Sequence, residues 1–329
     1  MQAPSTAWQE TVGADEGARF ETYAQQIVAL QKHTSESDGP GRGLHRKRRL
    51  GLHATVEIPD GLPAHARHGL SAVPGRHEAL IRMSNASHAR ASDRRPDLRG
   101  FALRIQGVEG EAALGGAAAA QCFLMINTPT FALPTVDEVV EVIQAVASGP
   151  LALARAMFKR HGFVGGLRRL RVLQQSLTKP FAGFALETFH TAAPVAWGPY
   201  AAKLRLAPTA VPPGPRATPA DWSADVVARL AGHALTWDLQ AQFFVGEDVT
   251  PIEDPTVLWP EAEAPFVTVA RVTAPSQAPG SSEGKVLAEA IERGTFDPWV
   301  ALAAHRPLGE IMRARKAAYF ASQCERGAR

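Results

Sequence analysis

Near the carboxyl end of the sequence, a tyrosine stands between two arginines at helical spacing. Residues 313–326 read RARKAAYFASQCER. In a helix, Arg315 lies four residues before Tyr319 and Arg326 lies seven residues after it, so all three share one face. A phenol binds iron well only as a phenolate, and a neighbouring guanidinium favours that anion without giving up its own proton. The segment therefore favours an iron ligand at Tyr319. The alternative is an amphipathic helix with a buried tyrosine.

Three further segments carry polar residues beside short apolar runs. They contain Arg42 with His45, Arg82 with Ser84, and Asn127 with Phe131. Each is weak evidence alone, because an isolated histidine at a strand edge is more often structural and an Asn-Thr-Pro is more often a turn. The sequence has no GxSxG, P-loop or HExxH motif, and its glycine-rich stretch 162–166 follows a helix rather than a strand.

The elements that must position these residues alternate in blocks along the chain. Apolar periodicity predicts helices over 15–34, within 135–177, over 283–293 and over 307–324. Short β-prone runs separated by turn residues predict strands over 52–58, 79–84, 100–106, 121–126, 200–206, 235–245 and 265–273. The stretch 208–221 is proline-rich and is expected to be a loop. This order indicates an α+β fold built on antiparallel sheet.

Composition narrows the class of protein. The chain has 329 residues, 45% of them hydrophobic, and a formal net charge of only +3. The basic run 46–49 is typical of a solvated face, so we expect no nucleic-acid role. The two cysteines form no CxxC pair. No secretory signal and no apolar run of ~18 residues is present, so we expect a cytoplasmic protein without a membrane span.

Taken together and in this order, the segments resemble the catalase family. Arg315, Tyr319 and Arg326 match its proximal motif; Arg42 and His45 match its distal motif. Arg82 with Ser84, the segment 96–102, Asn127-Thr-Pro, the stretch 237–273 and Phe296-Asp-Pro match further motifs, so the resemblance runs from about 40 to 326. The family's Asn-Asn-Thr-Pro is here Ile126-Asn127-Thr128-Pro129, and we take the retained second asparagine as catalytic.

The resemblance implies a catalase-like antiparallel β-barrel with surrounding helices and haem b in the barrel. An N-terminal helical arm would occupy 1–40 and the haem domain 41–329. Tyr319 would bind the iron, as tyrosine does in catalases, with Arg315 keeping it ionised. His45 would move the protons of the peroxide, Ser84 would fix the histidine tautomer and Asn127 would bind the peroxide, leading to a ferryl intermediate. Arg42, Arg82 and Arg326 would pair with the haem propionates, and Phe131 would pack on the porphyrin.

Departures from the family bear on the substrate. The sequence ends soon after the proximal motif and the segment after Asn127 is shortened, so the chain looks like the short branch of catalase-related peroxidases and allene oxide synthases. The position before the distal histidine is aliphatic in catalases and hydroxylated in allene oxide synthases, and here it is Leu44. We therefore expect a monomeric or homodimeric peroxidase acting on hydrogen peroxide or organic hydroperoxides with an organic electron donor. A hydroperoxide isomerase and a non-catalytic haem-binding protein are the alternatives.

Overall fold

The computed structural model describes residues 2–209, 211–219 and 221–328. Its nine strands are β1 (Arg48–Ile58), β2 (Gly75–Asn85), β3 (Arg99–Gln106), β4 (Ala120–Ile126), β5 (Phe189–His190), β6 (Val195–Trp197), β7 (Tyr200–Pro208), β8 (Leu235–Phe243) and β9 (Phe266–Ala274). Its six α-helices are α1 (Glu16–Asp38), α2 (Val136–Ser148), α3 (Pro150–Leu177), α4 (Ala224–Leu230), α5 (Ser282–Arg293) and α6 (Glu310–Glu325). The long elements confirm the α+β prediction.

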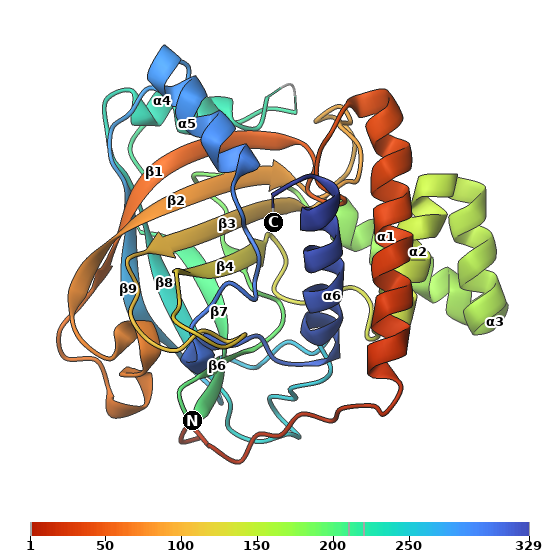
Figure 1. Cartoon of the computed structure of the whole chain (residues 1–329), viewed down its shortest axis with the longest axis horizontal. Coiled ribbons are helices and arrows are strands. Elements are labelled where there is room, and N and C mark those ends of the chain that lie inside the picture. The colour runs from red at the N-terminus through yellow and green to blue at the C-terminus, as the bar shows by residue number, and fades with distance from the viewer. Residues whose placement is uncertain (1, 210, 220, 329) are drawn as a thin grey trace.

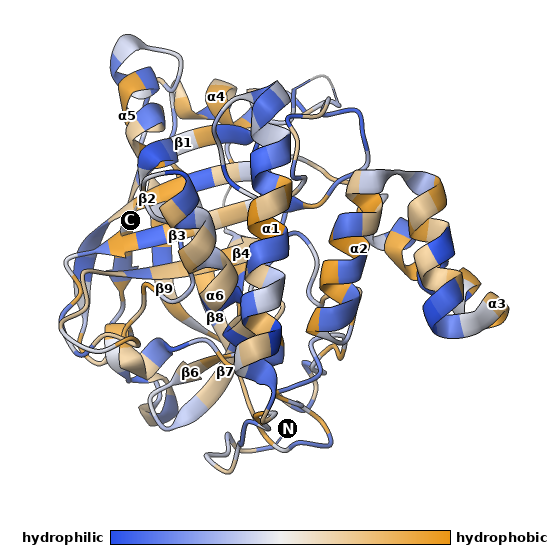
Figure 2. Ribbon diagram, turned by 45° about the vertical axis from the view of Figure 1, so that its right-hand side comes forward, coloured by the Kyte–Doolittle hydropathy of each residue, from blue (hydrophilic) through white to orange (hydrophobic). Residues whose placement is uncertain are grey.

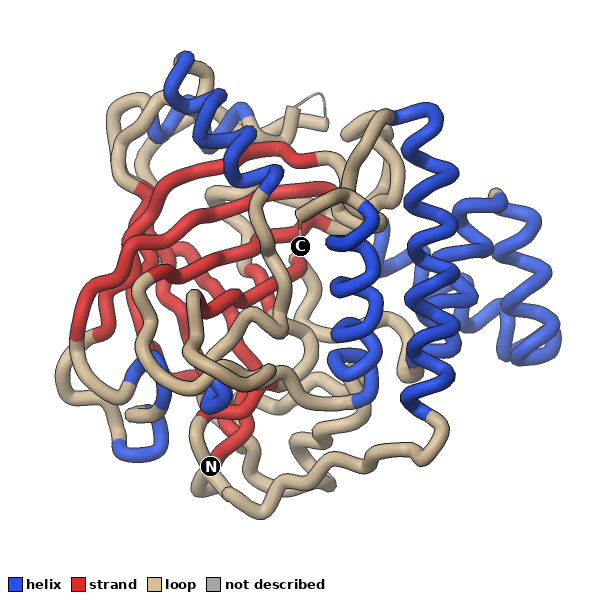
Figure 3. The backbone as a smooth tube through the Cα atoms, in the orientation of Figure 1, coloured by secondary structure: helices blue, strands red, loops and turns tan. Residues whose placement is uncertain are grey.

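The strands form a closed antiparallel barrel. Their order is β5-β4-β3-β2-β1-β9-β8-β7, and pairing of β5 with β7 closes the ring (Figures 1 and 3). The short β6 pairs with β7 outside the ring. Closure gives each of the eight ring strands a partner on both sides, which removes the unpaired edges that an open sheet would expose.

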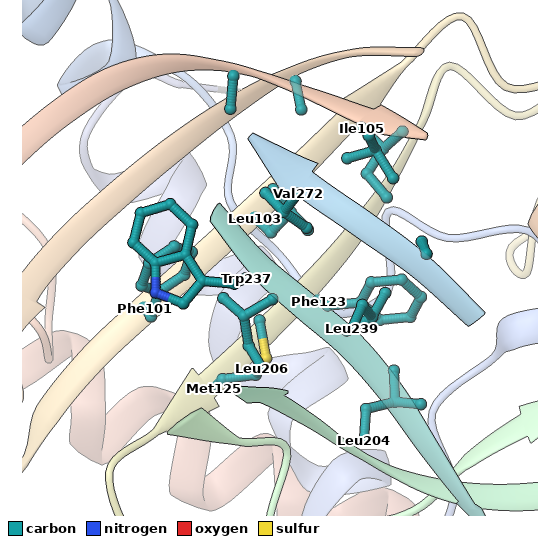
Figure 4. Packing of buried hydrophobic residues seen from close by; sticks show 14 of the residues in the cluster. Phe101, Leu103, Ile105, Phe123, Met125, Leu204, Leu206, Trp237, Leu239 and Val272 are labelled. Atoms are coloured by element: carbon teal, nitrogen blue, oxygen red, sulfur yellow. The ribbon is translucent and has the colours of Figure 1, made fainter. Parts of the chain in front are cut away.

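The barrel interior is a packed hydrophobic core. Along each strand alternate side chains point inward, and on β3 these are Phe101, Leu103 and Ile105, all fully buried. They meet Trp237 of β8 and residues from other strands (Figure 4). Burying a side chain of this size stabilises the fold by about 1.5–3 kcal/mol. The filled interior is a rigid support for groups on the outer surface of the strands.

Most helices gather on one side of the barrel. The helices α1 and α6 run parallel and lie against each other beside β1–β4 (Figure 1), since Arg19 pairs with Glu310 near their starts and Lys32 with Glu325 near their ends. The helices α2 and α3 extend beyond them (Figures 1 and 2). Arg313 of α6 binds Glu10, Glu16 and Glu253 and so ties this helix to the N-terminal segment, to α1 and to the loop after β8. No helix in the described part of the chain is both long and apolar enough to cross a membrane.

Some elements were not predicted. The helix α4 and the strands β5 and β6 are seven, two and three residues long, too short for a periodic signal. The predicted loop 208–221 includes residues 210 and 220, which lie outside the described residues; its other residues form no helix, and strand only at Pro208. The boundary predicted between 40 and 41 stays a prediction, although α1 packs against α6.

Candidate active site

A large cavity lies between the outer surface of the barrel and the helices. It encloses about 1390 Å³ of empty space, part of it open to solvent. Its walls come from β2–β4, from the segment 42–45 and from α1, α2 and α6. Large apolar side chains fill the barrel interior, so this cavity lies on the outer face of the strands, and the position of haem relative to the barrel stays a prediction.

Strand register decides which side chains reach this cavity. Ser84 of β2 is opposite Gly100 of β3, which is opposite Ile126 of β4. Arg82, Ala102 and Leu124 form the next row in the same way. These positions alternate with the inward-pointing residues, and all six line the cavity. We call this surface the strand wall.

His45 lies on the strand wall with its imidazole held by two neighbours. Its Nδ1 is 3.0 Å from the Ser84 hydroxyl. A Cβ atom at Gly100 would lie only 2.5 Å from the same Nδ1, so the ring packs where any larger residue would collide with it. The backbone of His45 has a positive φ of 52°, which is uncommon outside glycine, and Arg82 Nη2 donates to its carbonyl oxygen at 2.8 Å.

The electrostatic surroundings keep the His45 imidazole neutral. Burial lowers its pKa to about 3, and the positive charges of Arg82, Arg315 and Arg42 act in the same direction. A neutral imidazole can accept a proton, and its Nε2 has no hydrogen-bond partner among the described residues. His45 is thus available as a general base towards the cavity.

The opposite wall is one face of α6. Five residues of this segment line the cavity at helical spacing: Ile311, Arg315, Tyr319, Ser322 and Arg326. Arg315, Tyr319 and Arg326 thus share one face, as their spacing predicted. Arg315 Nη2 donates to the Tyr319 hydroxyl at 2.9 Å, and its guanidinium lies 5.1 Å from the centre of the tyrosine ring. We call this surface the helix wall. It faces His45 across the cavity.

Three arginines gather at the end of the cavity near the C-terminus of α5. Arg82 forms two bonds to the Glu292 carboxylate, at 3.0 and 3.2 Å, and Arg42 Nε lies 3.4 Å from it. Arg42 and Arg326 also donate to the Gly294 carbonyl oxygen. Burial, followed by Arg82 and Arg326, lowers the pKa of Arg42 to about 9. Burial alone would raise the pKa of Glu292, but Arg82 and Arg42 hold it below its usual value.

This group has an excess of positive charge. One carboxylate faces three guanidinium groups, which leaves two positive charges without a compensating anion in the cluster. Buried charges need partners. A ligand with two carboxylates would supply them.

Asn127 does not occupy the predicted position. Its Oδ1 accepts the backbone N–H of Arg99 at 2.8 Å, and Asn127 is not among the residues that line the cavity. Ile126 lines it instead, because Ile126 pairs with Gly100 and the next residue along a strand points to the opposite face. The position therefore gives no support to Asn127 as the peroxide donor.

Phe131 is one of the residues that line the cavity, and its packing on a porphyrin stays a prediction. It lines the cavity between the strand wall and α2, and its backbone N–H binds the Pro255 carbonyl oxygen at 3.0 Å. Nearby, Val136, Val139 and Ile143 of α2 give the cavity an apolar side. The sequence predicted only that these apolar residues belong to a helix, and it did not predict that they line a cavity.

The residues of the cavity fit a flat, dianionic, iron-containing macrocycle. Gly100 and Ala102 on one wall and Ala314 and Ala318 on the other leave room for a planar group. The tyrosine oxygen on the helix wall is a suitable iron ligand. The two uncompensated charges of the arginine cluster match the two propionates of haem.

Comparison with solved structures adds an independent observation. A fungal catalase superposes with a TM-score of 0.63 at 16% identity, over 88% of this chain and 60% of its own. The chain has the catalase fold. A bacterial catalase (TM-score 0.62, 15% identity, 99% and 63% coverage) and catalase A from Saccharomyces cerevisiae (0.59, 14%, 89% and 62%) agree. This chain spans about three fifths of the length of these solved catalases.

Sequence comparisons gave no such match. No family model and no curated protein matches this chain. At 14–16% identity, the similarity of the structures shows the fold and not the activity.

Sequence reasoning missed Gly100, Ile126 and Glu292. Gly100 could have been found, because a glycine inside a strand pattern often marks a close approach. Ile126 and Glu292 carry no such signal: their roles depend on register and on which helix end meets the arginines.

Proposed function

We propose that the protein is a haem-dependent, catalase-related peroxidase that decomposes hydrogen peroxide or reduces organic hydroperoxides. One observation carries the proposal: the Arg315–Tyr319 hydrogen bond on the helix wall faces the His45–Ser84 pair on the strand wall across one cavity. Bound haem b would supply the redox chemistry, with Tyr319 to hold its iron and Arg42, Arg82 and Arg326 to hold its propionates.

His45 performs the proton transfers. When Nδ1 donates its proton to the Ser84 hydroxyl, Nε2 carries the free lone pair. Nε2 accepts the hydroperoxide proton and returns it to the departing oxygen as the O–O bond breaks. General acid–base catalysis of this kind contributes typically 10²–10⁴-fold. Ser84 fixes the tautomer, Gly100 provides the space and Arg82 holds the backbone.

The helix wall holds the tyrosine oxygen in place. Arg315 Nη2 donates a charge-assisted hydrogen bond to the phenol oxygen at 2.9 Å and so fixes its position. Phe131 would pack against the macrocycle from the side of α2.

The cavity surface favours a hydroperoxide with an apolar substituent. The cavity that His45 lines has an apolar lining that includes Ile27, Ile126, Val139, Val140 and Ile143. Apolar walls bind an alkyl chain because its apolar surface is removed from water on binding. Leu44 offers no hydroxyl beside His45, which favours reduction over isomerisation.

Four measurements on the purified protein test the proposal. The absorption spectrum after haem reconstitution should show binding at one haem per chain. Oxygen evolution from hydrogen peroxide should be weak, and oxidation of a phenolic donor by cumene hydroperoxide should be readily detected. The alcohol should be the product of a fatty-acid hydroperoxide.

Other results select the alternatives. Epoxide-derived ketols, without alcohol or donor oxidation, identify a hydroperoxide isomerase. A stable haem spectrum without turnover of any peroxide identifies a binding protein. Absence of haem binding contradicts all three readings.

A further inference from the structure

The helix α3 carries large hydrophobic side chains that are more exposed than those elsewhere in the described residues. Leu151, Phe163 and Val164 are the most exposed large hydrophobic side chains of the described residues, at 84, 76 and 80%. Single exposed apolar residues are common, but a group of them in one region marks an interaction site. Figure 2 shows α3 at the side of the molecule, away from the barrel.

Two segments make up α3, and their inner faces are already occupied. The helix breaks at Gly162, where φ is 68°, into segments 150–161 and 163–177. The segments pack closely, since a Cβ at Gly166 would lie 3.0 Å from the Met157 backbone. Met157 and Leu173 are buried against Leu133 and α2. Leu151 and Val164 point away from these buried contacts, whereas Phe163 stacks on Phe158 of the first segment and still leaves most of its surface exposed.

The same outer surface is strongly cationic. The sequence of α3 contains six lysines and arginines and no aspartate or glutamate, whereas the whole chain carries a net charge of +3. Outside α3 the chain is therefore net negative. Arg160 pairs with Glu141 and Arg169 with Glu138. The other four, within the described residues, form no ion pair and are exposed: Arg155, Lys159, Arg168 and Arg171.

Helical spacing interleaves the charges with the apolar residues. Leu151, Arg155 and Lys159 follow one another at i, i+4 and i+8, and Val164, Arg168 and Arg171 at i, i+4 and i+7. A surface of this kind suits the boundary between lipid headgroups and acyl chains, where apolar side chains insert and cations meet anionic phosphates. Leu151 and Val164 gain nothing by stacking on bases, and the Phe163 ring already stacks on Phe158, which argues against a nucleic acid.

We propose that the outer surface of α3 docks on an anionic lipid bilayer. The helix α2 joins this surface to the candidate active site, because α3 packs on α2 and Val136, Val139 and Ile143 of α2 line the cavity. Docking brings the apolar side of the cavity towards the membrane. The docking proposal, combined with the proposed function on which this step rests, makes hydroperoxides of membrane lipids the substrate class.

Vesicle sedimentation tests docking without reference to activity. Wild-type protein is mixed with phosphatidylcholine vesicles, with and without ~30% phosphatidylglycerol, at low and high salt. Binding should require the anionic lipid and should weaken with salt. Replacing Arg168→Gln and Arg171→Gln together should weaken binding about 30-fold. Replacing Phe163→Ser and Val164→Ser together should weaken it at least ~10-fold.

Matched controls lie on the opposite side of the molecule. Arg67→Gln with Arg76→Gln removes two exposed cations, one from the segment between β1 and β2 and one from the start of β2. Val73→Ser removes a side chain of the same segment that is 71% exposed. These variants should bind like the wild type. Equal binding to neutral vesicles, or equal losses in the α3 and control variants, overturns the proposal. So does binding to duplex DNA, or self-association, in place of vesicle binding.

A second assay separates docking from the proposed function. Turnover of a phospholipid hydroperoxide in anionic vesicles is compared with turnover of soluble cumene hydroperoxide. The Arg168/Arg171 variant should lose the first and keep the second. Vesicle binding without turnover of either substrate contradicts the proposed function and leaves docking intact. Turnover of both substrates without vesicle binding contradicts docking alone.

Discussion

The helix wall and the strand wall of the cavity differ in how the chain builds them. The helix wall is one face of α6, so a single run of fourteen residues, 313–326, fixes the relation of Arg315, Tyr319 and Arg326. The strand wall combines His45, Ser84, Gly100 and Ile126, which come from four separate segments. Its geometry depends on pairing registers, where a shift of one residue exchanges the two faces of a strand. Local spacing is therefore enough to place the three residues of the first wall on one face, whereas the second wall also needs the pairing registers.

The largest effect is expected on the helix wall. Tyr319→Phe removes the oxygen that would hold the iron and should abolish haem retention or weaken it strongly, as read from the Soret band after gel filtration. Tyr23→Phe is a matched control, because Tyr23 also lines the cavity but its hydroxyl binds Asp137 at 2.6 Å. An unchanged ferric spectrum in the Tyr319 variant would show that another group holds the iron.

On the strand wall, His45→Ala should keep haem and lose at least ~10²-fold in peroxide reactivity, because the proton acceptor is gone. Stopped-flow absorption after mixing with hydrogen peroxide measures this rate. His53→Ala is the control, since His53 lies outside the cavity and pairs with Glu78. If only the His53 variant loses reactivity, the assignment of His45 fails.

A smaller effect tests the register itself. Ile126→Asn places an amide donor on the cavity surface and should raise peroxide reactivity about 10-fold, since such donors stabilise developing charge. Asn127→Ala should leave reactivity unchanged and lower stability by about 1–3 kcal/mol, because it leaves the buried Arg99 N–H without its acceptor. The opposite pattern would return the catalytic role to Asn127. Rates of reaction with peroxide and thermal unfolding of the two variants together decide which residue position faces the peroxide.

The smallest expected effect is that of pH. With its pKa near 3, His45 is already neutral at pH 5, so peroxide reactivity should change by less than about 2-fold between pH 5 and 8. Protonation would lower the rate only in stronger acid. A histidine with an ordinary pKa near 6.5 would lose about 30-fold over that range. Such a loss would mean that His45 is more solvated than the cavity indicates.

The same contrast explains what the sequence could predict of the fold. The long helices and seven strands were found because each has a periodic signal of its own. The position of the cavity outside the barrel was not found, since it depends on Phe101, Leu103 and Trp237 filling the interior together. The sequence suggested Asn127 rather than Ile126 because an amide side chain can do chemistry. Only the strand register shows that the Ile126 side chain points to the cavity face. Glu292 meets Arg82 only after α5 docks beside β1 and β2.

The pairing of β1 with β9 has a consequence for how the protein is made. It joins Thr55 to Thr273, so the barrel cannot close until most of the chain has been synthesised. Contacts between such distant residues form slowly. Tyr319 follows Thr273 by 46 positions in the sequence, which at the usual pace of translation is roughly 2–10 s later. The barrel strands are therefore all synthesised before the helix wall, and α6 completes the site only after them.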